Sequence, residues 1–415
     1  MLNRDAQRGS SDAAISADAL TTRYHYMDNL RALAMLGGVV FHAALSYSPL
    51  LGNLWPTASS DNSTLIDIAA WFSHLFRMPL FFLIAGFFAC YLLHKRDMAS
   101  LFKNRALRIL LPFVIFLPLL WTAFAVSFGW AMENVSNPSP LLGLMKMGAA
   151  MPEPPPPPTP TTTHLWFLYN LIQFYLVYAV LEWSGAMRSR VASVLTSLPF
   201  LLVVMPVLVA LALVGHYPPH PAPEQFTPQL WSFGFYGLFF LVGVQFFRDQ
   251  SLIDRLARWS PMLLIVALGA YAWWFPGLPE TIYFMEAMSR MEGVEFSAGQ
   301  FGQSLLQGLV AVYMTLVCLI AGKLLLDRAN AVVRFVADSS YWLYIIHLPL
   351  LFFIQFLLLD VDWGMWVEFA VATVGTIVIG LITYAVLVRH MPIGWLLNGR
   401  KRKASPPAPA AVTGP

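Results

Sequence analysis

Long apolar stretches follow one another along the chain and are separated by short polar segments. A helix that spans a membrane needs roughly 20 apolar residues. Ten stretches come close to that length: residues 29–50, 65–93, 106–131, 165–183, 194–214, 230–247, 260–276, 300–322, 340–359 and 364–388. The pattern predicts an all-α, polytopic integral membrane protein with about ten transmembrane helices. Pro79 falls inside the second stretch and is expected to kink or tilt that helix.

The composition of the 415-residue chain supports the same class of protein. Hydrophobic residues make up 58% of the chain and charged residues only 11%, against about 25% charged residues in a typical soluble domain. The two cysteines, Cys90 and Cys318, lie far apart in apolar stretches and are expected to be buried packing residues. The chain shows neither a glycine-rich phosphate loop nor a paired-cysteine pattern, so no metal site is predicted.

The lysine and arginine residues indicate the orientation of the helices. If the N-terminus is cytoplasmic, 21 of the 25 Lys and Arg residues fall in segments on the cytoplasmic side. Because positive residues are enriched in cytoplasmic loops, we expect both termini to be cytoplasmic. The chain then divides into a disordered cytoplasmic tail (1–22), a transmembrane domain (23–397) and a basic, then Pro/Ala-rich cytoplasmic tail (398–415). The basic tail is expected to set topology or contact anionic lipid, and no nucleic-acid partner is predicted.

Two outer segments carry signals of their own. Residues 151–163, "MPEPPPPPTPTTT", favour an extended polyproline helix, which can be a stiff linker or a docking site for a protein partner. Residues 277–299, "GLPETIYFMEAMSRMEGVEFSAG", form the longest outer segment without a proline run. This segment is either a short helix over the outer mouth of the protein or a solvated loop.

The first apolar stretch contains an arginine and a histidine. Arg31 and His42 are eleven positions apart, which in a helix places them about 20° apart around the axis and about 16 Å apart along it. They therefore share one face, with Arg31 near the cytoplasmic edge and His42 near the middle of the membrane. Gly38 leaves a gap on that face for a neighbouring helix or a bound chain. Asp28 lies one turn before Arg31 and can pair with it.

Other polar side chains fall at a similar depth. His74 and Arg77 lie near the middle of the second stretch, and His347 lies in the ninth. Polar groups inside a membrane normally face the bundle interior or a wet cavity. One buried histidine can be a neutral imidazole bonded between helices. Together with His42, these residues are more typical of a polar chamber, and Arg77 needs an anionic partner or ligand there.

An arginine pair lies at the cytoplasmic edge of the third stretch. Arg105 and Arg108 are one turn apart and serve either as positive anchors or as a clamp for phosphate oxygens. A neutral histidine can take a proton from a hydroxyl group. A phosphorylated donor anchored at the inner edge could thus present its reactive end to His42, while an acceptor arrives from the outer side. This layout suits acyl transfer by direct attack of a hydroxyl.

These residues resemble membrane acyltransferase family 3. "LRALAMLGGVVFH" fits the Arg-x10-His signature of that family, and four further motifs follow in the family's order: "FRMPLFFLIAGFF", "NRALRILLPF", "HLWFLYNL" and "SYWLYIIHLPL". The resemblance covers about residues 23–395. Within the family it is greatest to the branch of periplasmic glucan succinyltransferases.

The resemblance implies a ten-helix inner-membrane enzyme that uses acyl-CoA as co-substrate and a hydroxyl of an extracytoplasmic glycan as acceptor. It implies that His42 is the catalytic base and that Arg31, Arg105 and Arg108 bind the acyl-CoA. Ala85 stands where the family often has serine, so one polar contact is expected to be missing. The proline run is also outside the family pattern and is expected to alter the acceptor entrance. The remaining candidates line the site without a defined role: Asp28, His74, Arg77 and His347.

The residues leave other functions open. Ten helices with buried histidines also suit a secondary transporter or a flippase for a sugar-linked or anionic substrate, although no paired repeats are evident. An assembly or sensor protein could use the proline run as a docking arm. The acyl group, acetyl or succinyl, is not readable from the sequence, although Arg77 is well placed for the free carboxylate of a succinyl group.

Overall fold

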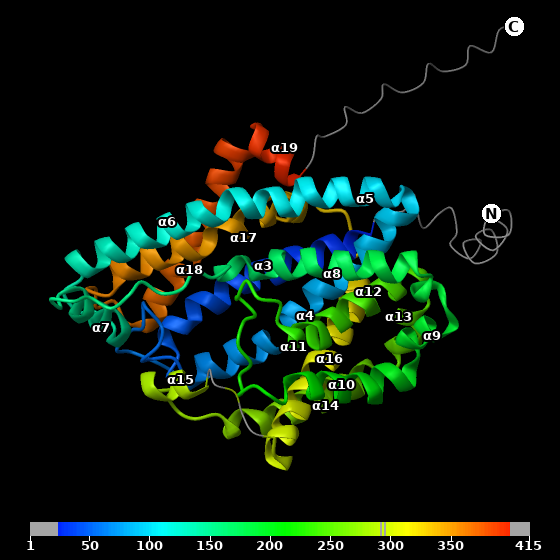
Figure 1. Ribbon diagram of the computed structural model, residues 1–415, viewed down its shortest axis with the longest axis horizontal. Coiled ribbons are helices and arrows are strands. Elements are labelled where there is room, and N and C mark those ends of the chain that lie inside the picture. The colour runs from blue at the N-terminus through cyan, green and yellow to red at the C-terminus, as the bar shows by residue number, and fades with distance from the viewer. Residues whose placement is uncertain (1–23, 291–292, 294–295, 399–415) are drawn as a thin grey trace, which may run out of the picture.

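The computed structural model describes residues 24–290, 293 and 296–398. This part of the chain is helical and contains no β-strand. The helices run side by side in an elongated bundle (Figure 1). The tail expected at residues 1–22 lies outside the described residues, and so does the tail expected at 398–415, apart from Asn398, which ends the last helix.

The helices follow one another along the chain, and longer connections occur at residues 48–63, 150–162 and 214–229. The first half contains α3 (His25–Ala44), α4 (Thr64–Lys95), α5 (Met98–Arg105), α6 (Leu111–Asn134), α7 (Pro140–Ala149), α8 (Trp166–Trp183), α9 (Arg190–Ser193) and α10 (Met205–Leu213). The second half contains α11 (Leu230–Ser232), α12 (Leu238–Arg248), α13 (Leu252–Ala257), α14 (Ser260–Trp274), α15 (Phe284–Arg290), α16 (Ala298–Leu326), α17 (Ala331–Leu358), α18 (Met365–Thr383) and α19 (Pro392–Asn398). Short 3₁₀ or π segments join or extend several of them: Leu45–Tyr47, Ala106–Leu110, Thr163–Leu165, Ala186–Arg188, Val194–Thr196, Phe200–Val204, Phe233–Gly237, Phe275–Gly277 and Tyr384–Val388.

The expected number of membrane spans is confirmed. Within the described residues, nine helices are long and apolar enough to cross a membrane, and one bent pair brings the number to as many as ten. The bent pair, residues 190–196 and 200–213, turns by 65° and corresponds to the stretch 194–214, which the sequence predicted as one helix. The second span, α4, runs through Pro79 over 32 residues.

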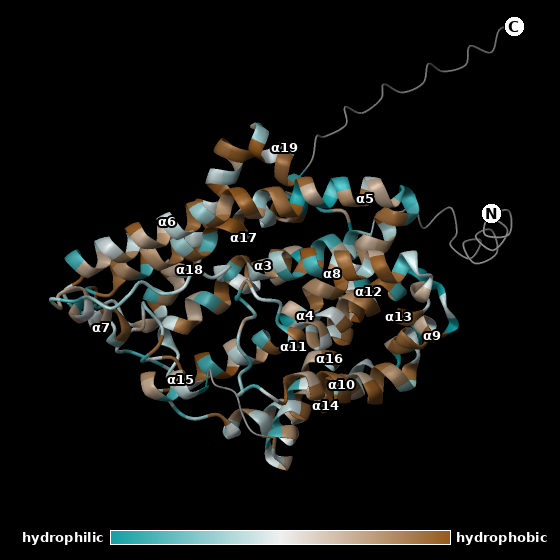
Figure 2. Cartoon of the chain, viewed as in Figure 1, coloured by the Kyte–Doolittle hydropathy of each residue, from teal (hydrophilic) through white to brown (hydrophobic). Residues whose placement is uncertain are grey.

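The two ends of the bundle differ in character. Helices α5, α9 and α13 lie at one end, and α7 and α15 lie at the other (Figure 1). We call these the basic end and the α15 end. Hydropathy colouring shows α10 and α14 as almost wholly apolar (Figure 2). Large apolar side chains such as Val126 (67% exposed), Ile265 (68%) and Val386 (68%) point outward, as expected where lipid replaces water around the protein.

A close contact joins α4 and α12 through two glycines. A Cβ atom added to Gly86 would overlap the backbone carbonyl of Phe240, and one added to Gly243 would overlap the carbonyl of Leu83. Small residues at such positions allow two helix backbones to approach closely, which is a main source of packing energy in membranes. The pair fixes α4, and with it the polar residues near the middle of α4.

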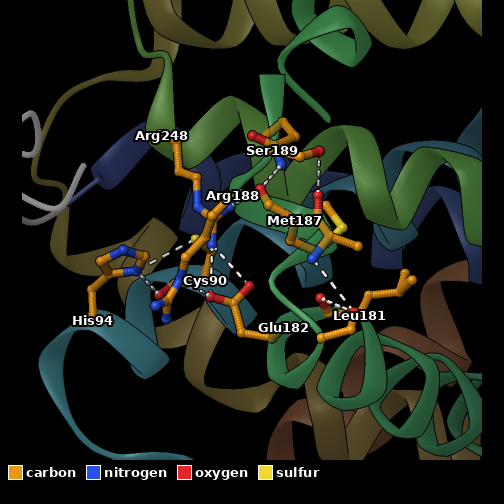
Figure 3. Close-up of polar contacts among 11 residues, drawn as sticks. Cys90, His94, Leu181, Glu182, Met187, Arg188, Ser189 and Arg248 are labelled. Carbon is orange, nitrogen blue, oxygen red and sulfur yellow. Dashed lines mark hydrogen bonds and ion pairs between the residues drawn. The ribbon is translucent and has the colours of Figure 1, made fainter. Parts of the chain in front are cut away.

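A buried ion-pair network holds α8 and α12 together at the basic end (Figure 3). The Glu182 carboxylate is 2% exposed and lies 2.8 Å from Nε of Arg188 and 2.9 Å from Nη2 of Arg248. Nε2 of Gln245 and Nη1 of Arg248 donate to the Met187 carbonyl. From the sequence, Arg188 and Arg248 were expected only to orient the helices in the membrane. Their pairing with Glu182 shows that they also fix the packing of these helices.

Cys90 lies beside this network. Its side chain is buried, as expected, and it is a free cysteine (Figure 3). Cys318 is also free and is half-buried. Both therefore act as packing residues rather than as a disulfide framework.

The helical segment Phe200–Leu213 is short for a span. Its 5 and 9 residues, at 1.5 Å each, extend about 21 Å, against a hydrocarbon thickness of about 30 Å. The chain that follows it, residues 214–229, has no regular structure and turns into the bundle, where His220 is only 3% exposed. Irregular backbone at such depth occurs where it is buried in protein or lines a cavity.

Candidate active site

A cavity of about 870 Å³ lies inside the bundle. Its deep part is lined by α3, α4 and α17, and its shallow part by residues 159–161, residues 216–229 and α15. Tyr217 and Phe226 on that rim are 37% and 41% exposed, so the cavity opens at the α15 end. Its volume lies in the upper part of the range of roughly 300–1,000 Å³ that is typical of small-molecule sites.

The structure places His42 against this cavity and two other histidines close by. The ring of His347 lies 5.3 Å from that of His42, and the ring of His164 lies 5.2 Å from that of His347. Nδ1–H of His347 donates to the Tyr344 carbonyl (2.7 Å), and Nε2–H of His164 donates to the Ile345 carbonyl (2.9 Å). These bonds hold both rings in fixed orientations, because a carbonyl can only accept.

His42 itself is not held in this way. Within residues 24–398 as described, its buried Nδ1 has no hydrogen-bond partner. The ring is positioned by packing, edge-on to Phe41 and parallel to Trp55, with centroids 5.2 and 6.2 Å away. An unpartnered polar atom at such a site needs an explanation, and a bound substrate or water would supply the missing bond.

Arg77 fills the gap that Gly38 leaves on α3. A Cβ at Gly38 would meet the Arg77 guanidinium at 3.8 Å, and Nη1 of Arg77 donates to the Gly37 carbonyl at 2.8 Å. The guanidinium also lies 4.6 Å from the centre of the Phe41 ring. Arg77 is 6% exposed, its Nε is unpartnered, and none of the ion pairs among the described residues involves it. A buried cation without a carboxylate favours an anionic or oxyanionic ligand.

His74 also packs against Phe41. Its ring stacks on Phe41 at 5.0 Å and lies edge-on to Trp71 at 5.4 Å. The His220 ring, from the irregular segment, is 4.9 Å away. Neither nitrogen of His74 has a hydrogen-bond partner in the described structure, so His74 offers a donor and an acceptor to the cavity.

His220 is fixed by two polar side chains. Burial lowers its pKa to about 4, so the imidazole is neutral near pH 7. Nδ1 lies 3.2 Å from Oε1 of Gln307 and Nε2 lies 3.0 Å from the hydroxyl of Tyr236. Because an amide oxygen only accepts, Nδ1–H donates to Gln307 and Nε2 accepts from Tyr236. His220 is thus a support for the cavity wall rather than a free base.

The three inner arginines lie apart from the cavity lining. Arg31 pairs with Asp28 at 3.5 Å, as expected, and its side chain is 41% exposed. Arg105 lies 4.9 Å from the centre of the Tyr175 ring, with its Nε unpartnered among the described residues. Arg108 is half-buried, and Arg105 is close enough to repel it.

One of the three arginines, Arg31, lies close to the cavity along α3. The inner part of the cavity lining includes Ala34 and Met35, which lie one helical turn from Arg31. The structure therefore brings His42, His74, Arg77 and His347 together around the cavity. The three inner arginines lie outside the cavity lining, toward the basic end.

Three histidines of the cavity were missed as site residues by the sequence analysis. His164 opens the motif "HLWFLYNL", while His216 and His220 lie in "HYPPHPAPEQFTPQ". The sequence did contain one signal for these residues. His220 lies between two prolines, in a segment that follows a short apolar stretch. Six histidines line the cavity, yet no group of three or more His, Cys, Asp or Glu in the described part of the chain is arranged to hold a metal ion.

This arrangement can move a proton and stabilise negative charge in a water-poor site. Histidine is the usual general base, and a fixed guanidinium aimed at a developing oxyanion is worth far more in such a site than in water. His42 belongs to α3, and the guanidinium of Arg77, which belongs to α4, contacts α3 at Gly37 and Gly38, about one turn before His42.

Comparison with known proteins agrees with this chemistry. The acyltransferase domain of family 3 matches residues 24–385. Glucans biosynthesis protein C of Escherichia coli K12 is 23% identical over 390 residues, covering 91% of this chain and 95% of that protein. The protein of the same name from Salmonella typhi is 24% identical over 389 residues, with the same coverage of both chains. No solved structure matches the chain. With a match over nearly its whole length, the chain belongs to acyltransferase family 3 and is a multi-pass membrane acyltransferase.

Proposed function

We propose that this protein is an inner-membrane O-acyltransferase that moves an acetyl or succinyl group from cytoplasmic acyl-CoA to a hydroxyl of an extracytoplasmic glycan. The observation that carries the proposal is the position of His42. It lines a cavity that opens at the α15 end, while arginines gather at the other end. The name of the relatives suggests a glucan as the acceptor. In this orientation the basic end is cytoplasmic, as the distribution of Lys and Arg favours.

In the proposed reaction, His42 removes the proton of the acceptor hydroxyl. The hydroxyl oxygen attacks the thioester carbonyl, and Arg77 stabilises the negative charge that develops on the carbonyl oxygen. The C–S bond then breaks, an ester is formed, and the proton on His42 passes to the thiolate of the leaving CoA. His347, fixed by the Tyr344 carbonyl, keeps the His42 ring in place by contact.

The donor is proposed to bind at the basic end. Arg105 and Arg108 provide forked cations for phosphate oxygens, and Arg31 lies one turn from the inner part of the cavity lining. The acyl chain would pass from there toward Met35 and Arg77. A carrier for a sugar-linked substrate would also need a cavity, but no other observation favours that alternative.

Loss of an inner arginine should weaken donor binding. We expect Arg105→Ala and Arg108→Ala each to raise KM for acyl-CoA about tenfold or more, because a hydrogen bond to a charged group contributes about 1.5–3 kcal/mol. Lys103→Ala is the matched control, since Lys103 is an exposed cation on the same helix as Arg105. Initial rates of transfer from labelled acyl-CoA in membranes measure the effect. An unchanged KM in both arginine variants would remove these residues from the donor site.

Arg77→Met tests how the acyl group is recognised. If Arg77 binds the free carboxylate of a succinyl group, transfer from succinyl-CoA should fall about ten- to a hundredfold more than transfer from acetyl-CoA. The two rates are measured side by side with the same acceptor. Equal losses with both donors would contradict this role and leave Arg77 to act on the reacting carbonyl.

Mass spectrometry of surface and periplasmic glycans from a deletion strain tests the proposal as a whole. Acyl groups should disappear from one glycan class and return with the wild-type protein but not with His42→Ala. Glycans that are unchanged by the deletion would contradict the proposed acceptor class.

A further inference from the structure

We propose that the end of the proline run and a second, proline-rich segment form a preorganised binding site for a neutral oligosaccharide at the mouth of the cavity. The segments are residues 159–162 and 217–229, and we call them together the outer collar. The inference rests on the proposed function and extends it, because it places the sugar units next to the acylated one and names what holds them.

The collar is built from two segments far apart in the sequence. The backbone N–H and the hydroxyl of Thr162 both donate to the Glu224 carbonyl, each at 2.8 Å. Thr162 is completely buried in this contact. Trp121 on α6 fixes the first segment by donating to the Thr161 carbonyl at 3.0 Å. The two segments are therefore held as one rim.

The second segment is fixed by side chains from two helices, α8 and α15. The Tyr169 hydroxyl donates to the Phe226 carbonyl at 2.6 Å, and the Asn170 amide donates to the Pro223 carbonyl at 3.3 Å. Arg290 on α15 donates to the Pro218 carbonyl at 3.4 Å. Three backbone carbonyls of the segment thus accept hydrogen bonds that hold its shape. A rim that is rigid before binding loses little conformational entropy when a ligand arrives.

The inner surface of the collar is rich in aromatic and uncharged polar side chains, and Glu224 adds one carboxylate. The cavity lining at the mouth includes Tyr217, Phe226 and Trp231, with Gln225, Thr227 and Gln229 between them. The C–H faces of pyranose rings pack on aromatic rings, and sugar hydroxyls pair with amides and hydroxyls. A few polar groups set among apolar surface are the usual composition of a small-molecule site.

The charges at the mouth disfavour an anionic polymer. Arg290 is the one Arg or Lys residue among the described lining residues of the mouth. It is paired with Glu286 at 2.7 Å and lies 4.8 Å from the centre of the Tyr217 ring. Glu224, also in the lining, would repel phosphate or carboxylate groups. A neutral glycan is therefore the occupant that fits.

Tyr217→Ala and Phe226→Ala test the collar. Each should raise KM for a long glucose oligosaccharide about tenfold, which is 1.4 kcal/mol of lost binding, with a much smaller effect when glucose is the acceptor. KM for acyl-CoA should stay at the wild-type value. Trp363→Ala is the matched control, because Trp363 is 58% exposed but lies outside the cavity lining.

Binding of the same oligosaccharide is also measured without donor, by equilibrium dialysis against detergent-solubilised protein. The two collar variants should bind it about tenfold more weakly than wild type, and Tyr217→Phe should bind normally because the ring is kept. Wild-type KM and affinity in both alanine variants would overturn the collar while leaving acyl transfer intact. Oligosaccharide binding without any acyl transfer would instead contradict the proposed function and keep the collar.

Discussion

Replacing His42 with alanine is expected to lower the rate of acyl transfer by about 10²- to 10⁴-fold, the usual loss when a general base is removed. The ring lies against the cavity with its Nδ1 unpartnered in the described structure, and its neighbour His347 is already bonded to a carbonyl. His347 therefore cannot swing into the role without losing that bond. KM for acyl-CoA should change little, because the inner arginines lie apart from His42.

The measurement is transfer of labelled acyl groups in membranes with equal amounts of each protein. His25→Ala is the matched control, since His25 begins the same helix and lies outside the cavity lining. Transfer by His42→Ala at the wild-type rate would show that another group accepts the proton, and the proposed mechanism would be wrong.

Replacing Gly86 with valine is expected to prevent assembly of the bundle. A Cβ at this position would overlap the Phe240 carbonyl, which belongs to the backbone of α12 and cannot rotate away. The helices would have to separate, and the reciprocal contact of Gly243 with the Leu83 carbonyl would be lost as well. Steric changes of this kind in a packed core belong to the class that costs more than about 4–5 kcal/mol.

Size-exclusion chromatography of detergent extracts measures the amount of monodisperse protein. Gly86→Val should yield almost none, and Gly243→Val should behave alike. Gly129→Val provides the control, because a Cβ at Gly129 on α6 meets nothing within 4 Å. Wild-type yield and melting temperature in Gly86→Val would mean that α4 and α12 do not pack as closely as described.

Hydropathy alone predicted most of the fold. The lengths of the apolar stretches predicted the membrane spans, because a helix that faces lipid must be apolar across the whole hydrocarbon layer. Helical periodicity placed Arg31 and His42 on one face, and it predicted the Asp28 pair that the structure contains. The position of each residue along its apolar stretch was enough to group His42 with His74, Arg77 and His347, which all line the cavity.

Other features depend on packing that no local pattern encodes. The gap at Gly38 was expected to hold a neighbouring helix or a bound chain, and the structure fills it with the Arg77 side chain of the neighbouring α4, which the sequence did not pair with Gly38. The stretch 194–214 was predicted as one helix, yet the structure bends it by 65° across residues 197–199. The segment 151–163 was expected to be a linker or a docking arm and to alter the acceptor entrance, and its residues 159–161 line the cavity. Residues 284–290 form the short helix that was one of two alternatives, and Arg290 reaches the mouth.

The five prolines among residues 217–229 have a further consequence. An amide hydrogen that is removed from water without a new acceptor is costly at membrane depth. Proline carries no amide hydrogen, so each one in this segment removes a group that would otherwise need solvation. This segment can thereby follow a non-helical path between the helices with fewer amide groups left unsatisfied, so the shape of the sugar-facing surface is set by imino acids rather than by an extra helix.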